Sequence, residues 1–179
     1  MVDVGASTAS VTAVHDGMIL KKGRTRWSLF LADAKRSTGT TKSNLGGNWV
    51  SDQLRLIFSQ SQPPVPLIPH YLIASKTPVD AGAPAQATFR TFGRPPQDTF
   101  RRLQEERVLT EFKESCVQIW NPQNNNGHNL AASADFIRSQ GAGRTFEMPD
   151  GWNNVFGMER FRAAEGLFDE KAAATVGPL

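Results

Sequence analysis

The chain has 179 residues, of which 39% are hydrophobic and 21% charged, with a formal net charge of +3. This composition excludes a disordered chain and indicates one globular domain or two small lobes. The single cysteine, Cys116, excludes an internal disulfide framework and indicates a reducing compartment. The three histidines have no metal-ligand spacing, and no apolar run reaches the length of a bilayer span, so we expect a soluble intracellular protein.

The first predicted element is a hairpin, with a strand over residues 1–4, a turn at Gly5 and a second strand over 10–15. Backbone N–H groups in such a turn can bind phosphate oxygens, and a carboxylate at the strand end, here Asp3, can hold a hydrated divalent metal. A plain hairpin has the same residue pattern. From these residues alone, both interpretations stay open.

Further along, residues 17–20 lead into a third strand through Arg26. Residues 33–43, rich in Ser, Thr and Lys, are typical of a surface insertion. Asn48 is expected to cap a helix. The apolar side of this helix follows helical spacing at Trp49, Val50, Leu54, Ile57 and Phe58.

The proline-rich segment 63–69 predicts an extended connection into a second lobe. Asp98 is expected to cap an amphipathic helix that runs to Cys116, followed by a strand over 117–120. The expected apolar face of this helix consists of Phe100, Leu103, Val108, Leu109 and Phe112.

Residues 121–127 predict a polar loop, and residues 144–157 a hairpin that turns at Pro149-Asp150-Gly151. Phe161 and Phe168 are expected in the core, and Cys116 as a small buried apolar residue. Two basic runs, 21–26 and Arg101-Arg102 with Arg107, are typical of a solvated face. We therefore expect contact with nucleic acid to be weak or indirect.

Three segments near the end of the chain closely resemble signature segments of the actin family in residues and spacing: Phe146-Glu147-Met148-Pro149-Asp150-Gly151, Gly157-Met158-Glu159-Arg160-Phe161-Arg162 and Glu165-Gly166-Leu167-Phe168. The hairpin over 3–17 has the length of the actin phosphate loop. Leu45-Gly46-Gly47 resembles the helix start that follows it. The resemblance implies an α/β, actin-like (ribonuclease H-like) ATPase fold.

The resemblance implies three parts. Residues 1–62 correspond to the start of actin subdomain 3, residues 63–143 to subdomain 4 with insertions, and residues 144–179 to the hairpin and the return toward subdomain 3. An actin fold closes two lobes around its nucleotide, with a phosphate turn from each. We therefore expect this chain to be an excerpt that binds ATP weakly or not at all on its own.

The resemblance also implies a nucleotide site. Asp3 would hold magnesium through water, the backbone of Gly5, Ala6 and Ser7 would contact phosphates, and further contacts would come from Gly47, Lys113 and Glu114. The alternatives are a hairpin-end acid, a helix-start glycine and a surface Lys-Glu pair. No catalytic residue is expected.

Several positions depart from the actin pattern. Ala6 replaces an aspartate and Ser10 a histidine near the attacking water, which puts hydrolysis in doubt because a hydroxyl handles protons poorly at neutral pH. Thr110 and Arg107 stand where actins have an arginine and a glutamate, which implies altered recognition of the base.

Gly5-Ala6-Ser7, Ile73-Ala74-Ser75-Lys76 and Glu165-Gly166-Leu167-Phe168 resemble a nuclear branch of the family. That branch implies a non-filamentous architectural subunit of chromatin-remodelling and histone acetyltransferase complexes in the nucleus, acting in transcription regulation and DNA repair. The expected ligand is ATP with Mg, bound without turnover. The expected partners are actin, a long helix adjoining a remodeller ATPase core, and histones or nucleosomes through the complex. The alternatives are an active ATPase or sugar kinase of the same superfamily, a filament-forming actin and a small basic nucleic-acid binder.

Overall fold

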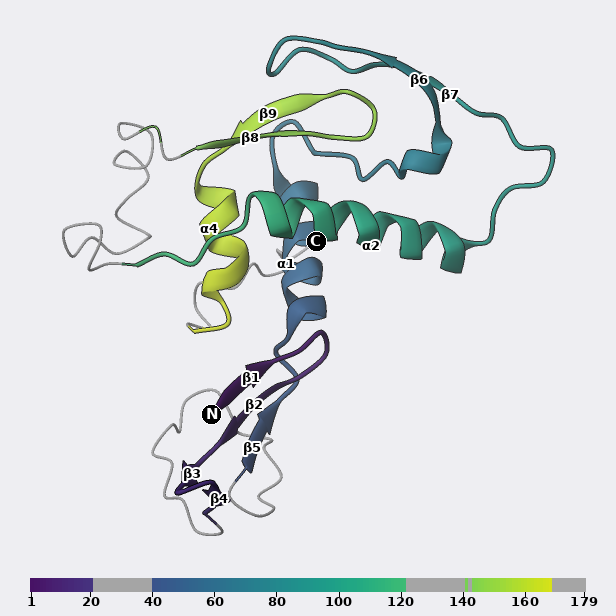
Figure 1. Cartoon of the computed structure of the whole chain (residues 1–179). Coiled ribbons are helices and arrows are strands. Elements are labelled where there is room, and N and C mark those ends of the chain that lie inside the picture. Colours follow the sequence, from purple (N-terminus) through teal and green to yellow (C-terminus); the bar gives the residue numbers. More distant parts are fainter. Residues whose placement is uncertain (21–39, 122–140, 142, 169–179) are drawn as a thin grey trace.

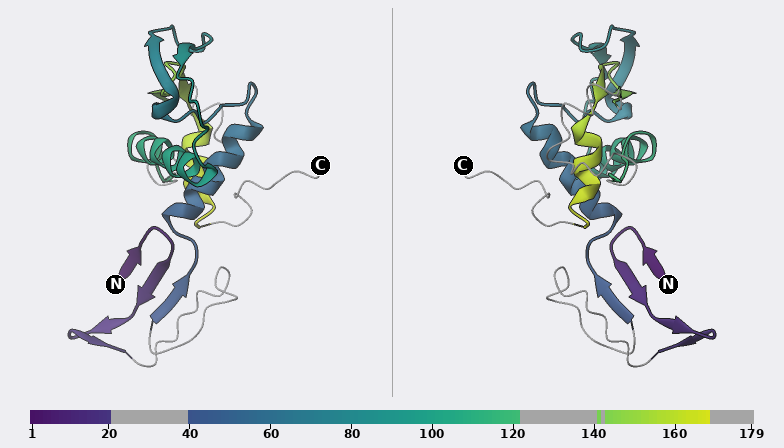
Figure 2. Two further views of the ribbon diagram at one scale, coloured as in Figure 1. Left: turned by 90° about the vertical axis from the view of Figure 1, so that its right-hand side faces the viewer. Right: turned by 90° about the vertical axis from the view of Figure 1, so that its left-hand side faces the viewer.

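The computed structural model describes residues 1–20, 40–121, 141 and 143–168. A small sheet lies at one end, and helix α1 joins it to a cluster of helices and hairpins at the other end (Figure 1). The two side views show the same two parts meeting at the start of α1 (Figure 2). Several predicted features fall wholly or mostly outside the described residues: the strand to Arg26, the basic run 21–26, the insertion over 33–43 and the loop over 121–127.

The sheet consists of β1 (Val2–Val4), β2 (Ala9–Thr12) and β5 (Thr40–Ser43), antiparallel in that order. The predicted first hairpin is confirmed, with Asp3 opposite Ser10. Residues 40–43 were expected in a surface insertion, and that prediction is wrong because they pair with β2 and complete the sheet.

The second predicted strand is shorter than expected, because the chain leaves the sheet after Thr12. β3 (Val14–His15) then pairs with β4 (Met18–Ile19) in a separate hairpin. Asp16 and Gly17 form its turn with φ of 48° and 76°. Positive φ at both central residues is the geometry that matches the twist of paired strands.

Helix α1 (Gly47–Gln60) begins earlier than predicted, with Gly46 as its N-cap and Asn48 inside the helix. The prediction of an Asn48 cap is wrong because backbone acceptors from the first hairpin occupy this helix start. The buried face is close to the predicted one and also includes two polar residues, Ser51 and Gln53. Its apolar residues are Val50, Leu54, Ile57 and Phe58.

The proline-rich segment leads, as predicted, out of α1 without forming helix or strand. It enters a one-turn helix, η1 (His70–Leu72), and a hairpin of β6 (Ile73–Thr77) and β7 (Gln86–Phe89) that the sequence did not predict. Both strands are largely exposed, so they lack the apolar alternation that predicts a strand.

Helix α2 (Asp98–Ser115) has the predicted extent, but Asp98 is its first residue and makes no capping bond. Only its second half is buried, because α1 crosses it there (Figure 1). The predicted apolar face is therefore wrong at Phe100 and Leu103, which are 43% and 55% exposed. Phe100 packs instead on Tyr71, with ring centroids 5.1 Å apart.

The predicted strand over 117–120 is wrong. Arg160, in α4 (Met158–Glu165), holds this segment through side-chain bonds from Nε to the Cys116 carbonyl oxygen and from its Nη2 to Gln118 Oε1, both 2.7 Å. The Gln118 N–H donates to the Arg160 carbonyl oxygen at 3.1 Å. Burial lowers the pKa of Arg160 from its ordinary value. Contacts to a helix thus replace a strand ladder.

The hairpin predicted over 144–157 is confirmed as β8 (Arg144–Glu147) and β9 (Asn153–Phe156). Gly151 takes φ 89° in its turn and donates its N–H to the Met148 carbonyl oxygen at 2.9 Å. After α4, Leu167 packs on the core and Phe168 is 56% exposed, so the core prediction is confirmed for Phe161 and wrong for Phe168.

The core lies where α1, α2, α4 and the β8–β9 hairpin meet. Phe112 is fully buried at its centre, with ring centroids 5.1, 5.0 and 4.8 Å from those of Phe58, Phe146 and Phe156. Edge-on aromatic contacts of this kind add to the free energy of burial. Cys116 is 1% exposed beside them, as predicted for a small apolar residue.

We expect Phe112→Ala to lower the free energy of unfolding by about 3–5 kcal/mol, because it leaves a cavity among three other rings. Leu103→Ala on the same helix should change it by less than about 0.5 kcal/mol, since that side chain is exposed. Urea unfolding followed by circular dichroism measures both. Equal losses for the two variants would contradict this assignment of the core.

Candidate nucleotide site

The turn of the first hairpin is fastened to the first turn of α1. The N–H groups of Gly47 and Asn48 donate to the carbonyl oxygens of Gly5 and Ala6 at 3.0 and 2.6 Å. A Cβ added at Gly46 would lie 2.7–2.8 Å from backbone atoms of the turn, closer than real Cβ contacts. Only glycine therefore allows the turn to approach the helix this closely.

The turn keeps some of its own groups available. The Gly5 N–H donates to the Thr8 carbonyl oxygen at 2.8 Å. Ala6 and Ser7 are exposed, and their N–H groups have no acceptor within the described part of the chain. Asp3 is also exposed. Exposed N–H groups next to a free carboxylate fit the chemistry of a phosphate accompanied by a hydrated divalent cation.

Lys113 brings α2 to the same helix start. Its Nζ donates to the Gly47 carbonyl oxygen at 3.3 Å, to Ser51 Oγ at 2.7 Å and to Glu106 Oε1 at 3.4 Å. Gly47 and Lys113 are 66 residues apart in the sequence. The structure therefore brings together the predicted residues of the turn, the helix start and α2.

Glu114 is the exception among the predicted site residues. It is exposed and makes no hydrogen bond or ion pair within the described residues. Of the two departures on α2, Thr110 donates its hydroxyl to the Glu106 carbonyl oxygen at 2.9 Å, and Arg107 is exposed and reaches Gln104 Oε1 at 3.4 Å. These residues do not join the group around Lys113.

Sequence reasoning missed Ser51 and Glu106, the two side chains that hold Lys113. Ser51 also donates to the Gly47 carbonyl oxygen at 3.2 Å and makes a short hydrogen bond to Glu106 Oε1. The available signal was spacing, since residues four apart and seven apart share a helix face. Ser51 follows Gly47 by four residues and Lys113 follows Glu106 by seven.

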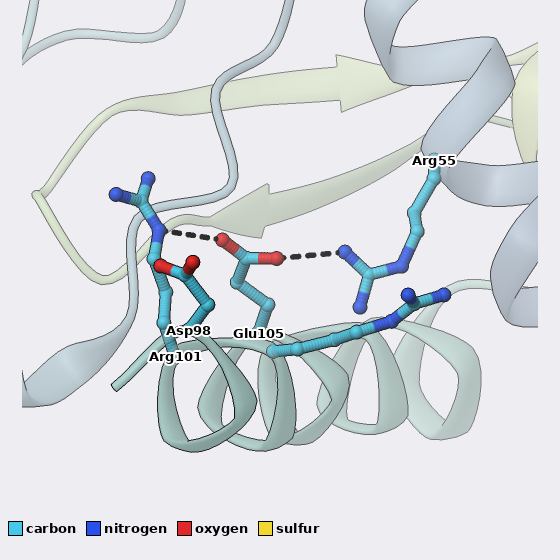
Figure 3. Close-up of a pocket in the computed structure, with 5 residues that line it drawn as sticks. Arg55, Asp98, Arg101 and Glu105 are labelled. Atoms are coloured by element: carbon cyan, nitrogen blue, oxygen red, sulfur yellow. Dashed lines mark hydrogen bonds and ion pairs between the residues drawn. The ribbon is translucent and has the colours of Figure 1, made fainter. Parts of the chain in front are cut away.

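A separate pocket of about 280 Å³ lies beside the first half of α2. It is lined by Arg55 of α1 and by Asp98, Arg101, Arg102 and Glu105 of α2. Glu105 lies between two guanidinium groups, with Arg101 Nε at 3.0 Å and Arg55 at 2.9 Å (Figure 3). The hydrogen bond that Arg101 donates to the Glu105 carboxylate raises the pKa of Arg101. Of the five side chains that line the pocket, three are cationic and two carry carboxylates. None of them belongs to the predicted nucleotide site.

Two features are absent from the part of the chain that the structure describes: a metal-ligand cluster and a membrane-spanning helix. Within that part of the chain, no three His, Cys, Asp or Glu side chains are grouped as metal ligands. No described helix has both the length and the apolar character needed to cross a membrane.

The comparisons with known proteins place these features in a family. The Actin family model matches residues 34–178, so the chain belongs to the actin family and has a partial actin fold. This confirms the resemblance and the fold class inferred from the sequence. The match begins after the first hairpin, so it does not cover the turn at Gly5.

Within the family, the chain is similar to "Actin-related protein 4" of three fungi. It is 45% identical to that of Emericella nidulans, 42% to that of Neurospora crassa and 41% to that of Gibberella zeae, in each case over 96–97% of this chain. These alignments span only 32–34% of the relatives' length. The chain thus corresponds to about a third of the length of the curated relatives that it matches.

We expect Gly46→Ala to separate the turn from α1, since the added methyl meets backbone oxygens that have little room to shift. The amide hydrogens of Gly47 and Asn48 should exchange faster, and stability should fall by about 1–3 kcal/mol. Hydrogen exchange measured by NMR reports both. Gly47→Ala is the matched control, because its Cβ would lie at an ordinary 3.6 Å. Equal protection in the two variants would contradict the close approach.

Proposed function

We propose that this protein is a non-filamentous, actin-related architectural subunit of nuclear chromatin-remodelling and histone acetyltransferase complexes. It would serve transcription regulation and DNA repair, with ATP and Mg as a structural ligand. The observation that carries the proposal is the 45% identity to an actin-related protein 4 over 96% of the chain. The nuclear-type residues at Gly5-Ala6-Ser7 support the same branch of the family.

The geometry at the start of α1 supports nucleotide binding. The exposed N–H groups of Ala6 and Ser7 suit phosphate oxygens, Asp3 suits hydrated magnesium, and Lys113 at Gly47 suits the other end of a nucleotide. A ligand that binds only the folded state stabilises it by mass action. Bound ATP would therefore stabilise the subunit without being consumed.

The residues that replace those of actins argue against turnover. Ala6 brings no carboxylate to the turn, and Ser10, directly across from Asp3 in the sheet, offers a hydroxyl where a histidine would exchange protons near pH 7. Proton handling contributes roughly a hundredfold to ten-thousandfold to catalytic rates. The protein would therefore bind ATP but hydrolyse it very slowly.

The proposed partners follow from the family branch. They are one actin molecule, a long helix adjoining a remodeller ATPase core, and histones or nucleosomes reached through the complex. The proposed location is the nucleus, and contact with nucleic acid would be indirect or weak. In the described residues, Arg101 of the second basic run is already paired with Glu105. This pairing supports the interpretation of the run as a solvated face.

For the complete protein, we expect phosphate release from MgATP to be slower than that of actin filaments. Ala6→Asp combined with Ser10→His should raise it by about a hundredfold, because the pair restores a carboxylate and a proton acceptor. Thr12→His places the same imidazole two residues farther from the turn and should have no such effect. Wild-type release at or above the filament rate would contradict slow turnover.

We also expect the complete protein to form a one-to-one heterodimer with actin on a single long remodeller helix, rather than a filament. Co-purification from nuclear extract followed by native mass spectrometry measures the stoichiometry. Open-ended homopolymers, or no association with actin, would refute the architectural role.

A further inference from the structure

The Lys113 clamp is the set of three groups that surround the Lys113 ammonium where α2 meets the start of α1: the Gly47 carbonyl, the Ser51 hydroxyl and the Glu106 carboxylate. Ser51 is 1% exposed, whereas the Lys113 and Glu106 side chains are 20% and 34% exposed. The clamp is therefore anchored in the core on one side and open to solvent on the other.

The clamp saturates the lysine. An ammonium group has three N–H donors, and here each one has an acceptor from the chain. The bond to Ser51 Oγ, at 2.7 Å, is the shortest. The bonds to the Gly47 carbonyl and to Glu106, at 3.3 and 3.4 Å, are longer and weaker. A ligand atom that accepts from Lys113 can therefore replace a long bond while the bond to Ser51 is kept.

The charges of the clamp favour one kind of acceptor. The Glu106 carboxylate offsets the charge of Lys113 and also receives Arg55 at 3.5 Å. A carboxylate this close repels phosphate, while a neutral ring nitrogen or sugar hydroxyl meets no such repulsion. The turn at Ala6 and Ser7, in contrast, presents N–H groups and no acidic side chain of its own. The two ends of the site thus suit different parts of a nucleotide.

We propose that Ser51 and Glu106 are positioning residues for the base end of a bound nucleotide. They hold the Lys113 ammonium at the start of α1, and an uncharged acceptor of the base or ribose takes the place of its long bond to the Gly47 carbonyl oxygen while the bonds to Ser51 and Glu106 are kept. This inference rests on the proposed function, namely that the complete protein binds ATP. It assigns roles to two side chains that touch Lys113 and not the phosphates.

The first test measures MgATP affinity of the complete protein by calorimetry. Ser51→Ala and Glu106→Ala should each weaken binding about tenfold, the effect of losing one hydrogen bond to a charged group. Ser51→Thr and Glu106→Gln, which keep an acceptor for Lys113, should recover most of the affinity. Magnesium tripolyphosphate, a probe of the phosphate end alone, should bind equally to wild type and Ser51→Ala.

Glu105→Ala is the matched control, because Glu105 is the adjacent residue on α2 and also pairs with Arg55 of α1, but does not contact Lys113. It should leave MgATP affinity unchanged. A loss equal to that of Glu106→Ala would overturn the inference, since both residues would then act only by packing α2 on α1.

The second test needs no nucleotide. Acylation of Lys113 by a succinimidyl ester, followed by mass spectrometry, should be slow in wild type and severalfold faster in Ser51→Ala and Glu106→Ala, but not in Glu105→Ala. Equal labelling in all four proteins would overturn the clamp. Wild-type protein that binds no MgATP would instead overturn the proposed function, a result distinct from the other two.

Discussion

The first N–H groups of an α-helix have no acceptor within the helix, and in this chain the turn of the first hairpin supplies acceptors for α1. The carbonyl oxygens of Gly5 and Ala6 take this role, and Gly46 leaves room for them because it has no Cβ. This contact fixes the sheet against a helix whose other end lies in the core. It also directs the remaining N–H groups of the turn outward, where a ligand can reach them.

The polar contacts of α1 and α2 continue from that point along one side of their crossing. Lys113, Ser51 and Glu106 lie beside Gly47, and Arg55 with Glu105 follows one turn later. The apolar side of the same crossing contains the aromatic core around Phe112. Partly buried ion pairs contribute little net stability, because desolvation offsets the attraction. The aromatic core therefore stabilises the helix pair, and the polar row fixes which groups reach the start of α1.

Local chemistry in the sequence predicted the elements that depend on neighbouring residues. The Pro149-Asp150-Gly151 turn, the first hairpin and the extent of α2 are set by turn residues and by helical periodicity. Several of the errors involve a distant segment. Asn48 is not a cap because a hairpin turn 42 residues earlier provides the acceptors, and 117–120 is not a strand because Arg160 provides its contacts. Phe100 is exposed because α1 crosses only the other half of α2.

The candidate site shows the same difference between what neighbouring residues determine and what distant segments determine. Family resemblance identified Gly5, Gly47 and Lys113 separately. Gly5 meets Gly47 because the hairpin turn contacts the start of α1, and Lys113 meets Gly47 because α2 crosses α1. Ser51 and Glu106 have no motif, because their role arises only from that crossing. In the proposed function, the backbone donors of the turn and the Lys113 ammonium, which is paired with Glu106, would bind a nucleotide without exchanging protons. Turnover requires a group that gains and loses a proton beside the attacked phosphate, and the first hairpin of this chain provides the methyl of Ala6 and the hydroxyl of Ser10 instead. These residues therefore support the proposal that ATP would be retained as part of the fold.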